Sequence, residues 1–383
     1  MNKLVETVDL RTNFYTYEGV VKALNGVSVV VDHGSTFGLV GESGCGKSVT
    51  VRSIMRIVQE PGRIESGKIL LYFDEQDQEK GTDLLQQSEV YMQQLRGNQV
   101  SMIFQEPNSA LNPILSINEQ ICESFLFHQK KDLAQQALQA LQNGGMKGVG
   151  ILKPYYHAMV ARYVENADDV LLKIFSKLPI LRRWDKPIRL EATRRSIEII
   201  GKLGIANPEH IVCCYPHEIS GGMKQRIVIA IALACNPVLL IADEPTSNLD
   251  VTIQAQILEL IKELKEKYIS SVLFITHDLG VVAETCDRVG VMYAGNICEI
   301  ADVQELFRNP KHPYSSALLH AVPKVEQEGA LSSIEGSVPN LVHPPSGCRF
   351  HPRCPKAMDV CRTEVPPTTE IADNHFVACY LYS

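Results

Sequence analysis

The sequence of 383 residues lacks any apolar run long enough to cross a membrane, which requires about 20 residues. It also lacks a signal-peptide pattern at its N-terminus. Basic residues are not in excess, because 37 Lys and Arg stand against 44 Asp and Glu, for a formal net charge of −7. This balance gives no global attraction to nucleic acid or anionic lipid. We therefore expect a soluble, cytoplasmic protein.

Tryptophan is nearly absent, with one residue, whereas cysteine is plentiful, with eleven. Stable disulfides are not expected in the cytosol, so these cysteines need another explanation. A hydrophobic content of 45% and a charged content of 21% are those of an ordinary globular protein. The length suggests about two or three domains.

A glycine-rich loop lies between an apolar strand and a helix predicted to begin at Lys47, within Phe37–Val51. Gly41, Gly46, Lys47 and Ser48 fit the pattern G-x-x-x-x-G-K-[ST] of a phosphate-binding loop. Glycines let the backbone wrap closely around a phosphate chain, and free N–H groups point at it. Lys47 is expected to reach the β- and γ-phosphates, and Ser48 to coordinate Mg²⁺. The nucleotide-binding residues expected here are Gly41, Ser43, Gly44, Cys45, Gly46, Lys47, Ser48 and Val49.

Polar side chains follow two further apolar strands where each strand ends. Val238–Ala242 ends at Asp243 and Glu244, and the stretch SVLFITHD places His277 after its strand. A carboxylate in this position can hold Mg²⁺, and the next one can polarise an attacking water. Strands alternating with helices, with polar groups at the strand ends, predict a largely parallel α/β sheet.

The N-terminal residues 4–14 and 20–31 read as two strands joined by a polar turn. Aromatic residues gather there, and one of Phe14, Tyr15 and Tyr17 could stack on adenine. The alternative is that Phe14 belongs to the core.

A second anion-binding geometry is predicted in YPHEISGGMKQR, which leads into an apolar helix. Ser220, Gly221 and Gly222 lie at the start of that helix. The preceding residues 114–210 look helical, and they follow an apolar strand that ends at Gln105.

One helix is predicted over Met159–Leu178, where apolar residues recur at i, i+3 and i+4, and it stops at Pro179. A basic run with the single tryptophan, Trp184, follows. This segment could sit at a membrane interface. The interpretation we favour is a helix packed on its own subdomain with a solvated charged tail.

Four cysteines near the C-terminus have the spacing C-x₅-C-x₆-C-x₁₇-C, and they are Cys348, Cys354, Cys361 and Cys379. Four thiolates in a loop-rich segment could hold a metal that supplies folding energy. Spacing alone favours a metal site over free thiols and leaves Zn²⁺ and an iron–sulfur cluster both open.

In chain order, the phosphate-binding loop, a glutamine after a strand, ISGGMKQR, LLIADEPTSNLD and ITHD resemble the nucleotide-binding subunits of ABC transporters. The resemblance implies a P-loop ABC ATPase of the α/β class. Its core would carry an antiparallel β edge, a helical subdomain and a small Cys-rich C-terminal domain.

The same resemblance implies roles for single residues. Asp243 would hold Mg²⁺ through water, Glu244 would be the general base, and His277 would contact the γ-phosphate. Gln105 would sense Mg²⁺ and water while touching the membrane subunit. Phe14 matches the adenine-stacking position best, with Tyr15 and Tyr17 close by.

Another set of residues would act across a dimer. Ser220, Gly221 and Gly222 would cap the ATP of a partner subunit, so that two domains sandwich two nucleotides head to tail. Asp250 would belong to the loop that communicates between the two sites. Ile219 and Met223 depart from the commoner LSGGQ but leave the Ser-Gly-Gly backbone intact, so we expect activity.

The C-terminal stretches NPKHPYSSALLHAVP and GCRFHPRCPKAMDVC resemble the tail of ATP-binding subunits of oligopeptide/dipeptide-type importers. This resemblance shifts the four-cysteine prediction toward a structural [4Fe-4S] cluster, with Zn²⁺ as the alternative. It implies an ATPase core over 1–105 and 236–300, a helical subdomain over 106–235 and a C-terminal extension over 301–383. A surplus near 143–190 has no role derived from the family.

The implied function is ATP hydrolysis that powers import of solutes, with oligopeptides or dipeptides as the expected cargo. The partners would be a second ATPase subunit, two permease subunits and an extracellular solute-binding protein, at the cytoplasmic face of the membrane. One alternative is a non-transport ABC ATPase acting on DNA or the ribosome. Another is a redox sensor in which the cysteines gate ATP use.

The thiol of Cys45 lies beside the expected phosphates at a helix start, where thiol pKa values tend to fall. We therefore expect a reactive thiol whose alkylation blocks hydrolysis.

Overall fold

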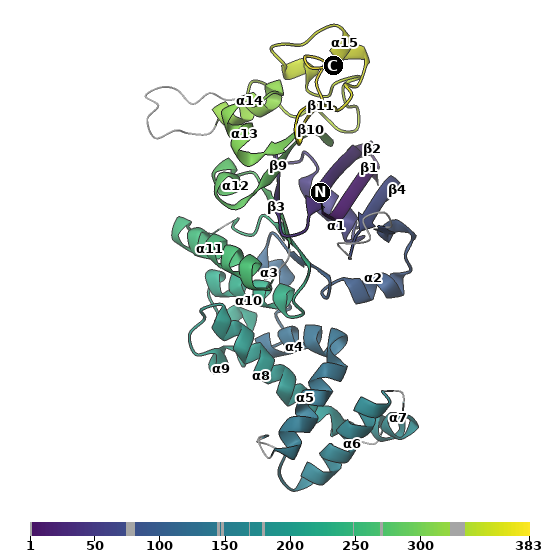
Figure 1. Ribbon diagram of the computed structural model, residues 1–383, viewed down its shortest axis with the longest axis vertical. Coiled ribbons are helices and arrows are strands. Elements are labelled where there is room, and N and C mark those ends of the chain that lie inside the picture. The colour runs from purple at the N-terminus through teal and green to yellow at the C-terminus, as the bar shows by residue number, and fades with distance from the viewer. Residues whose placement is uncertain are drawn as a thin grey trace. The chain divides into compact units, whose positions relative to one another are not determined.

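The computed structural model describes residues 2–73, 81–143, 146, 149–167, 169–177, 181–247, 249–268, 271–321 and 334–383. These residues form two compact units (Figure 1). The first unit contains Met1–Arg96, Val238–Thr246 and Ile261–Ser383, and the second contains Gly97–Pro237 and Ser247–Leu260.

The first unit begins with an antiparallel sheet in the order β2-β1-β4-β5. Its strands are β1 (Lys3–Thr16), β2 (Gly19–Asp32), β4 (Gly62–Leu71) and β5 (Thr82–Asp83). The predicted pair of strands joined by a short polar turn is confirmed by the pairing of β1 with β2. This sheet is the antiparallel edge that the resemblance implied.

A second, mixed sheet carries the loops that are predicted to bind the nucleotide. In the first unit its strand order is β11-β12-β10-β9-β3-β8-β7. The strands β3, β7, β8 and β9 are parallel, which confirms the predicted parallel core, whereas β10, β11 and β12 pair in antiparallel fashion. Their bounds are β3 Thr36–Val40, β7 Leu239–Asp243, β8 Ser271–Thr276, β9 Arg288–Tyr293, β10 Asn296–Asp302, β11 Thr369–Ala372 and β12 His375–Val377.

Helix α1 (Lys47–Ile54) begins at the predicted residue and ends at Ile54, before the turn at Met55 and Arg56. The reason lies at Arg56, whose φ of 51° is left-handed and incompatible with a continuing helix. The Arg56 guanidinium donates to the carbonyls of Leu84 and Gln87, which holds the chain in this turn.

The other helices of the first unit are short. They are η1 Leu84–Gln86, α2 Glu89–Leu95, α12 Leu279–Thr285, α13 Val303–Arg308, α14 Pro313–His320, η5 His351–Arg353 and α15 Val360–Thr363. Helix α11 (Val251–Tyr268) runs from the second unit into the first.

The C-terminal residues pack into the core of the first unit. Strand β12 pairs with β10, so residues 369–377 extend the mixed sheet. Tyr293, Tyr314 and Phe350 are almost fully buried in one hydrophobic cluster, with ring centroids 4.6–5.2 Å apart. The extension therefore shares its core with the strands that carry the nucleotide loops.

The second unit is mainly helical, as predicted for residues 114–210. Its elements are β6 Val100–Ile103, α3 Pro107–Ala110, α4 Ile117–His128, α5 Lys130–Gln142, η2 Gly150–Leu152, α6 Lys153–Glu165, α7 Val170–Lys177, η3 Leu181–Asp185, α8 Lys186–Lys202, α9 Pro208–Ile211, η4 Pro216–Glu218 and α10 Gly221–Leu233. Among the described residues, no helix of the protein is both long and apolar enough to span a bilayer.

The prediction of one continuous helix over Met159–Leu178 is wrong. The structure has two helices there, α6 and α7, and Asn166 between them adopts extended φ and ψ angles of −145° and 104°. Arg162, before this break, and Asp169, after it, form an ion pair at 3.3 Å. Periodicity alone missed the break because the apolar spacing continues across it. The predicted end of the helix at residues 178–179 lies outside the described residues.

Trp184 is packed within the second unit, because only 7% of it is exposed. Its ring lies 5.4 Å from that of Tyr163, and the ammonium group of Lys130 lies 5.2–5.4 Å from both ring centres. These contacts favour the interpretation of an internally packed segment over a membrane anchor.

Candidate active site

The predicted phosphate-binding loop connects β3 to α1 and is closely packed against strand β9. Gly41 has a φ of 154°, and a Cβ atom there would lie 2.1 Å from the carbonyl oxygen of Met292. Gly46 has a φ of 108°, and its Cβ would lie 2.8 Å from the Ala23 carbonyl oxygen. Both positions therefore require glycine, for space as well as for backbone conformation.

Lys47 and Ser48 occupy the first turn of α1. Lys47 is 5% exposed, and its Nζ donates to the carbonyls of Gly41 at 2.8 Å and Glu42 at 3.1 Å. The Ser48 hydroxyl donates to Oδ1 of Asp243 at 2.9 Å. The Lys47 ammonium group is therefore bound to backbone carbonyls of the loop itself. The Ser48 hydroxyl is bound to the carboxylate at the end of β7.

Asp243 is 1% exposed, and this burial raises the pKa of its carboxyl group, with the Ser48 hydrogen bond acting in the opposite direction. A hydroxyl and a buried carboxylate are the hard oxygen ligands that Mg²⁺ prefers. The donor set at this point fits a magnesium ion held between α1 and β7.

Glu244 and His277 lie together beside that pair. The Nδ1 atom of His277 is 3.2 Å from Oε1 of Glu244. The Glu244 backbone N–H donates to the carbonyl of Ile275 at 2.9 Å, and its φ of 48° is left-handed. A non-glycine residue held in this conformation is strained, and such strain clusters at functional sites. The parallel pairing of β7 with β8 brings these two residues together.

The prediction of a reactive thiol at Cys45 is wrong. Cys45 is fully buried, and burial is the largest cause of a raised pKa of its thiol, although the nearby Lys47 opposes that rise. The predicted low pKa followed from the helix start alone, and the burial of the side chain outweighs that effect. Cys45 serves the loop through its backbone, since its carbonyl accepts from the Gly295 N–H at 2.7 Å.

The remaining expected ATP-site residues on loops lie in the second unit. Ser220 is the N-cap of α10 and accepts from the N–H of Met223 at 3.4 Å. Gly222 packs beside Ile253, where a Cβ atom would lie 3.2 Å from the isoleucine side chain. Gly221 has open space instead, with nothing within 4 Å of its Cβ position.

Asp250 and Gln105 are also exposed in the second unit. Asp250 Oδ1 accepts from the Ile253 N–H at 3.0 Å at the start of α11. The Gln105 carbonyl accepts from the Ser247 hydroxyl at 3.1 Å, so the loop after β6 is tied to the segment after β7. Asn248, which follows Ser247 in the chain, lies outside the described residues.

Of the three candidate adenine partners, Phe14 is half-buried on β1 and lies close to Gly62 of β4. The Tyr15 hydroxyl donates to Glu65 at 2.8 Å. Tyr17 lies in the turn and is 98% exposed.

Comparisons with known proteins identify the family of the chain. Residues 24–247 match the ABC transporter family, and residues 298–361 match the oligopeptide/dipeptide transporter C-terminal region. The chain belongs to the ABC transporter family. The oligopeptide transport ATP-binding protein AppD of Bacillus subtilis is 42% identical over 384 residues, covering 100% of this chain and 98% of the relative. The dipeptide transport ATP-binding protein DppD of the same organism is 40% identical over 383 residues, covering 100% and 95%.

A solved dimeric post-hydrolysis state of the ATP-binding cassette MJ0796, bound to ADP and Pi, has a TM-score of 0.54. It is 20% identical and covers 78% of this chain and 99% of that chain, so it supports the fold. As a member of the ABC family, this protein is an ATP hydrolase that uses Mg²⁺.

In this ABC ATPase the four C-terminal cysteines, Cys348, Cys354, Cys361 and Cys379, all line one small cavity. Burial raises the pKa of Cys348 to about 11, and it also raises the pKa values of Cys354 and Cys379. Among the described residues, no group of three or more His, Cys, Asp or Glu side chains is placed to hold a metal ion.

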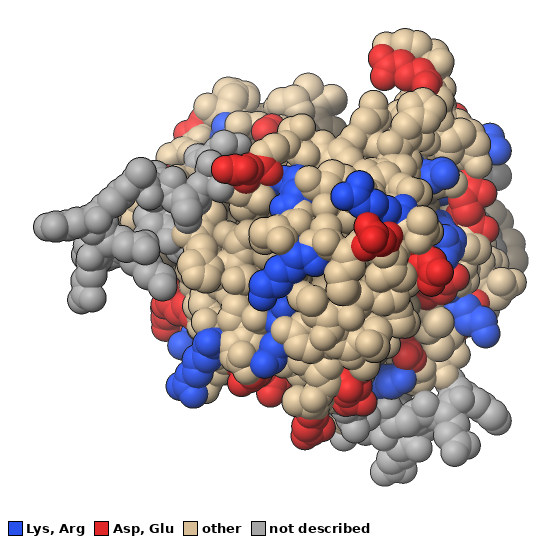
Figure 2. Space-filling model, turned by 90° about the horizontal axis from the view of Figure 1, so that it is seen from above, with Lys and Arg blue, Asp and Glu red and all other residues tan. Residues whose placement is uncertain are grey.

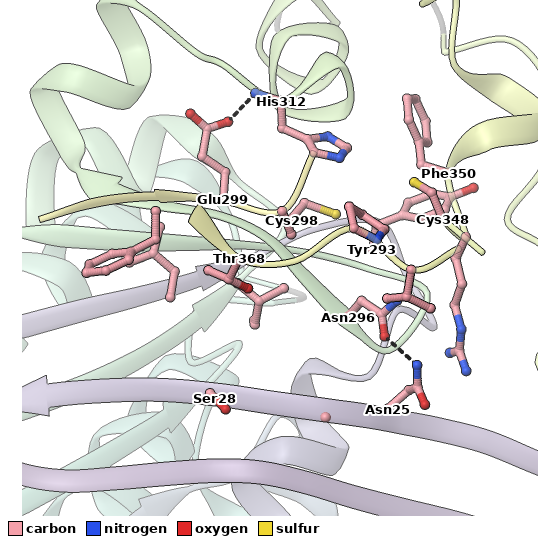
Figure 3. A pocket seen from close by; sticks show the side chains of 18 of the residues that line it. Asn25, Ser28, Tyr293, Asn296, Cys298, Glu299, His312, Cys348, Phe350 and Thr368 are labelled. Carbon is pink, nitrogen blue, oxygen red and sulfur yellow. Dashed lines mark hydrogen bonds between the residues drawn. The ribbon is translucent and has the colours of Figure 1, made fainter. Parts of the chain in front are cut away.

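A buried carboxylate anchors the C-terminal extension close to these cysteines. Glu299 of β10 is fully buried beside Cys298 and accepts from the backbone N–H of Lys311 at 2.8 Å and of His312 at 2.9 Å (Figure 3). Nε2 of His375 is 2.8 Å from the same carboxylate. These contacts join β10, β12 and the start of α14.

Sequence reasoning missed the residues that support the phosphate-binding loop from the C-terminal side. The Glu42 backbone N–H donates to the Tyr314 hydroxyl at 3.0 Å, and the Glu42 carboxylate pairs with Arg353. More than 270 positions separate each pair in the chain. No local pattern could have indicated contacts at this separation.

Proposed function

We propose that this chain is the ATP-hydrolysing subunit that powers import of oligopeptides or dipeptides through a membrane transporter. The observation that carries the proposal is the cluster of Lys47, Ser48, Asp243, Glu244 and His277 in a chain whose C-terminal region matches that of oligopeptide/dipeptide transporters. The cluster supports the chemistry, and the C-terminal match supports the class of cargo.

Each residue of the cluster has a distinct task in this mechanism. Loop N–H groups and Lys47 bind the phosphate chain, and Ser48 and Asp243 are the residues that would hold Mg²⁺. When bound, Mg²⁺ would neutralise charge that develops on the phosphates. Glu244 accepts a proton from the attacking water, and His277, at 3.2 Å, orients this carboxylate and contacts the γ-phosphate.

Residues of the second unit complete the site of a partner subunit. Ser220, Gly221 and Gly222 present the N-terminus of α10, which suits a phosphate, and Asp250 lies on the loop that links the two sites. Gln105 senses Mg²⁺ and water and reports to the membrane subunit, and Phe14 stacks on adenine. ATP binding then closes a pair of ATPase subunits, and closure moves two attached permeases because the open and closed states make different contacts.

The test is affinity purification of the full chain from native membranes, followed by mass spectrometry. We expect a second ATPase subunit, two integral-membrane subunits and an extracellular solute-binding protein. Labelled dipeptide uptake should then disappear in cells that carry Glu244→Gln. Recovery of ribosomal proteins or DNA-repair factors without a permease would refute import.

Nucleic-acid binding is the weaker alternative. The face seen in Figure 2 carries Lys and Arg side chains interspersed with Asp and Glu, so it presents no continuous basic surface. Proteins that grip a phosphate backbone gather basic residues on one face. The overall charge of −7 points the same way.

The four cysteines form the basis of a second proposal, a structural [4Fe-4S] cluster in the C-terminal extension. The supporting observation is that Cys348, Cys354, Cys361 and Cys379 line one cavity. We favour the cluster over Zn²⁺ because the C-terminal region matches that of oligopeptide/dipeptide transporters; among the described residues no group of side chains is placed to hold a metal ion. When bound, the cluster would cross-link the segment and supply folding energy.

Anaerobic purification of the full chain tests this proposal through visible absorption together with iron, sulfide and zinc analysis. We expect iron and inorganic sulfide in equal amounts, and their loss in Cys354→Ser but not in Cys213→Ser, which changes an exposed cysteine of the second unit. Zinc alone, or no metal, would refute the cluster. If the cysteines instead act as a redox sensor, reducing them should change the rate of ATP hydrolysis while the C-terminal extension stays folded.

A further inference from the structure

The phosphate-binding loop contains one carboxylate, Glu42, which comes directly after Gly41. Its carbonyl accepts from Lys47 Nζ at 3.1 Å and from the Cys45 N–H at 3.3 Å, so its backbone is part of the loop's own framework. A carboxylate here is electrostatically unfavourable, because the loop serves to bind the negative phosphate chain. The carboxylate therefore needs a counter-charge.

Arg353 of η5 supplies that charge. Its Nη1 lies 2.7 Å from Glu42 Oε2 and its Nη2 lies 3.1 Å from Glu42 Oε1, a bidentate pair. Only 6% of the arginine side chain and 26% of the glutamate side chain are exposed, so the pair is weakly screened by solvent.

Three further hydrogen bonds fix the Arg353 guanidinium group in place. Nε donates to the Glu335 carbonyl at 2.9 Å, Nη2 also donates to the Ile334 carbonyl at 3.2 Å, and Nη1 to the Tyr293 hydroxyl at 3.3 Å. With the two bonds to Glu42, these use all five N–H donors of the guanidinium group. No freedom remains for the group to turn away from the loop.

A second support reaches the same residue from α14, where the Tyr314 hydroxyl accepts from the Glu42 backbone N–H at 3.0 Å. Tyr314 belongs to the buried aromatic cluster with Tyr293 and Phe350. Both the backbone and the side chain of Glu42 are thus fixed by the C-terminal half of the chain.

We propose that Arg353 is a positioning residue for ATP binding: through its bidentate pair with Glu42, the C-terminal extension neutralises the phosphate-binding loop and holds it in shape. Arg353 acts through Glu42 and does not itself touch the nucleotide. The C-terminal extension then contributes to ATP binding through Arg353, whatever the role of its cysteines.

The test is steady-state ATP hydrolysis and equilibrium ATP binding by the full chain carrying Arg353→Met. Leaving Glu42 charged and unpaired in the loop should raise KM and Kd for ATP about tenfold, while kcat stays within about twofold, because the groups that perform the chemistry are untouched. Arg353→Lys keeps the charge but loses the fork, so it should recover only part of the affinity.

The matched control is Arg349→Met. Arg349 is also buried and lies four residues earlier, but it donates to the carbonyls of Lys22 and Ala294 and makes no ion pair with the loop. It should lower thermal stability with KM within about twofold of the wild type. An equal rise of KM in both variants would show a general loosening of the extension and overturn the proposal.

A double-mutant cycle separates the pair from independent effects. If Arg353 acts through Glu42, the variant Glu42→Gln/Arg353→Met should bind ATP no more weakly than Arg353→Met alone, because the unpaired charge is gone. Additive losses of affinity, or wild-type KM in Arg353→Met, would overturn the proposal.

Discussion

The phosphate-binding loop and the cysteine cavity lie in the same unit, yet they are built in opposite ways. The loop is a single run of residues from Gly41 to Ser48, whose shape follows from glycines and a helix start. The cavity collects cysteines from Cys348 to Cys379 and is also lined by His312 of another segment. A site made from consecutive backbone can be predicted from a motif, whereas a site made from separate segments shows only its donors in the sequence.

This comparison implies different consequences of mutation. Changes in or beside the loop should alter nucleotide chemistry with little effect on folding, because the surrounding strands are already buried. Changes in the cavity should alter stability with little effect on the chemistry. The Arg353–Glu42 pair is the exception, since it joins the two regions.

The largest expected effect is that of Glu244→Gln on ATP hydrolysis. Removing a general base costs about 10²–10⁴-fold in rate, so kcat should fall by that amount while ATP still binds. Single-turnover hydrolysis with radiolabelled ATP measures this, and Glu284→Gln, an exposed carboxylate on α12, is the control. A kcat within tenfold of the wild type would exclude Glu244 as the base.

The next largest effect is expected at Gly41. An alanine Cβ would lie 2.1 Å from the Met292 carbonyl, so Gly41→Ala must displace the loop, and ATP affinity should fall about 100-fold. Gly44→Ala is the matched control, because its φ of 77° is strained but nothing lies within 4 Å of its Cβ position. It should lose less than about tenfold. Equal losses, measured by titration calorimetry, would contradict the role of packing.

The comparison of the phosphate-binding loop with the cysteine cavity also shows how far the sequence could predict the structure. The parallel core, the start of α1 at Lys47 and the meeting of Ser48 with Asp243 were predictable, because each follows from a local pattern at a strand end. The break at Asn166 and the burial of Cys45 were not, because each depends on how segments pack. Non-local pairs such as Glu42 with Arg353 leave no periodic signal at all.

A smaller effect, on stability, should come from Cys348→Ser. Cys348 packs against the buried aromatic cluster and lines the cysteine cavity, so losing its sulfur should lower the unfolding midpoint by roughly 5 °C. The rate kcat should stay within about twofold. Differential scanning fluorimetry beside an ATPase assay measures both, with Cys213→Ser as the control. A collapse of kcat without a change in the midpoint would mean that the cavity takes part in turnover.

The smallest effect is expected from thiol alkylation at Cys45. The thiol is fully buried and its pKa is raised by that burial, so little reactive thiolate is present or accessible near neutral pH. Peptide mass spectrometry after iodoacetamide treatment of the folded protein should find Cys213 modified and Cys45 intact, with ATPase activity retained in Cys213→Ser. Rapid labelling of Cys45 that ATP prevents would show that the loop opens in solution far more than its contacts with Met292 and Gly295 allow.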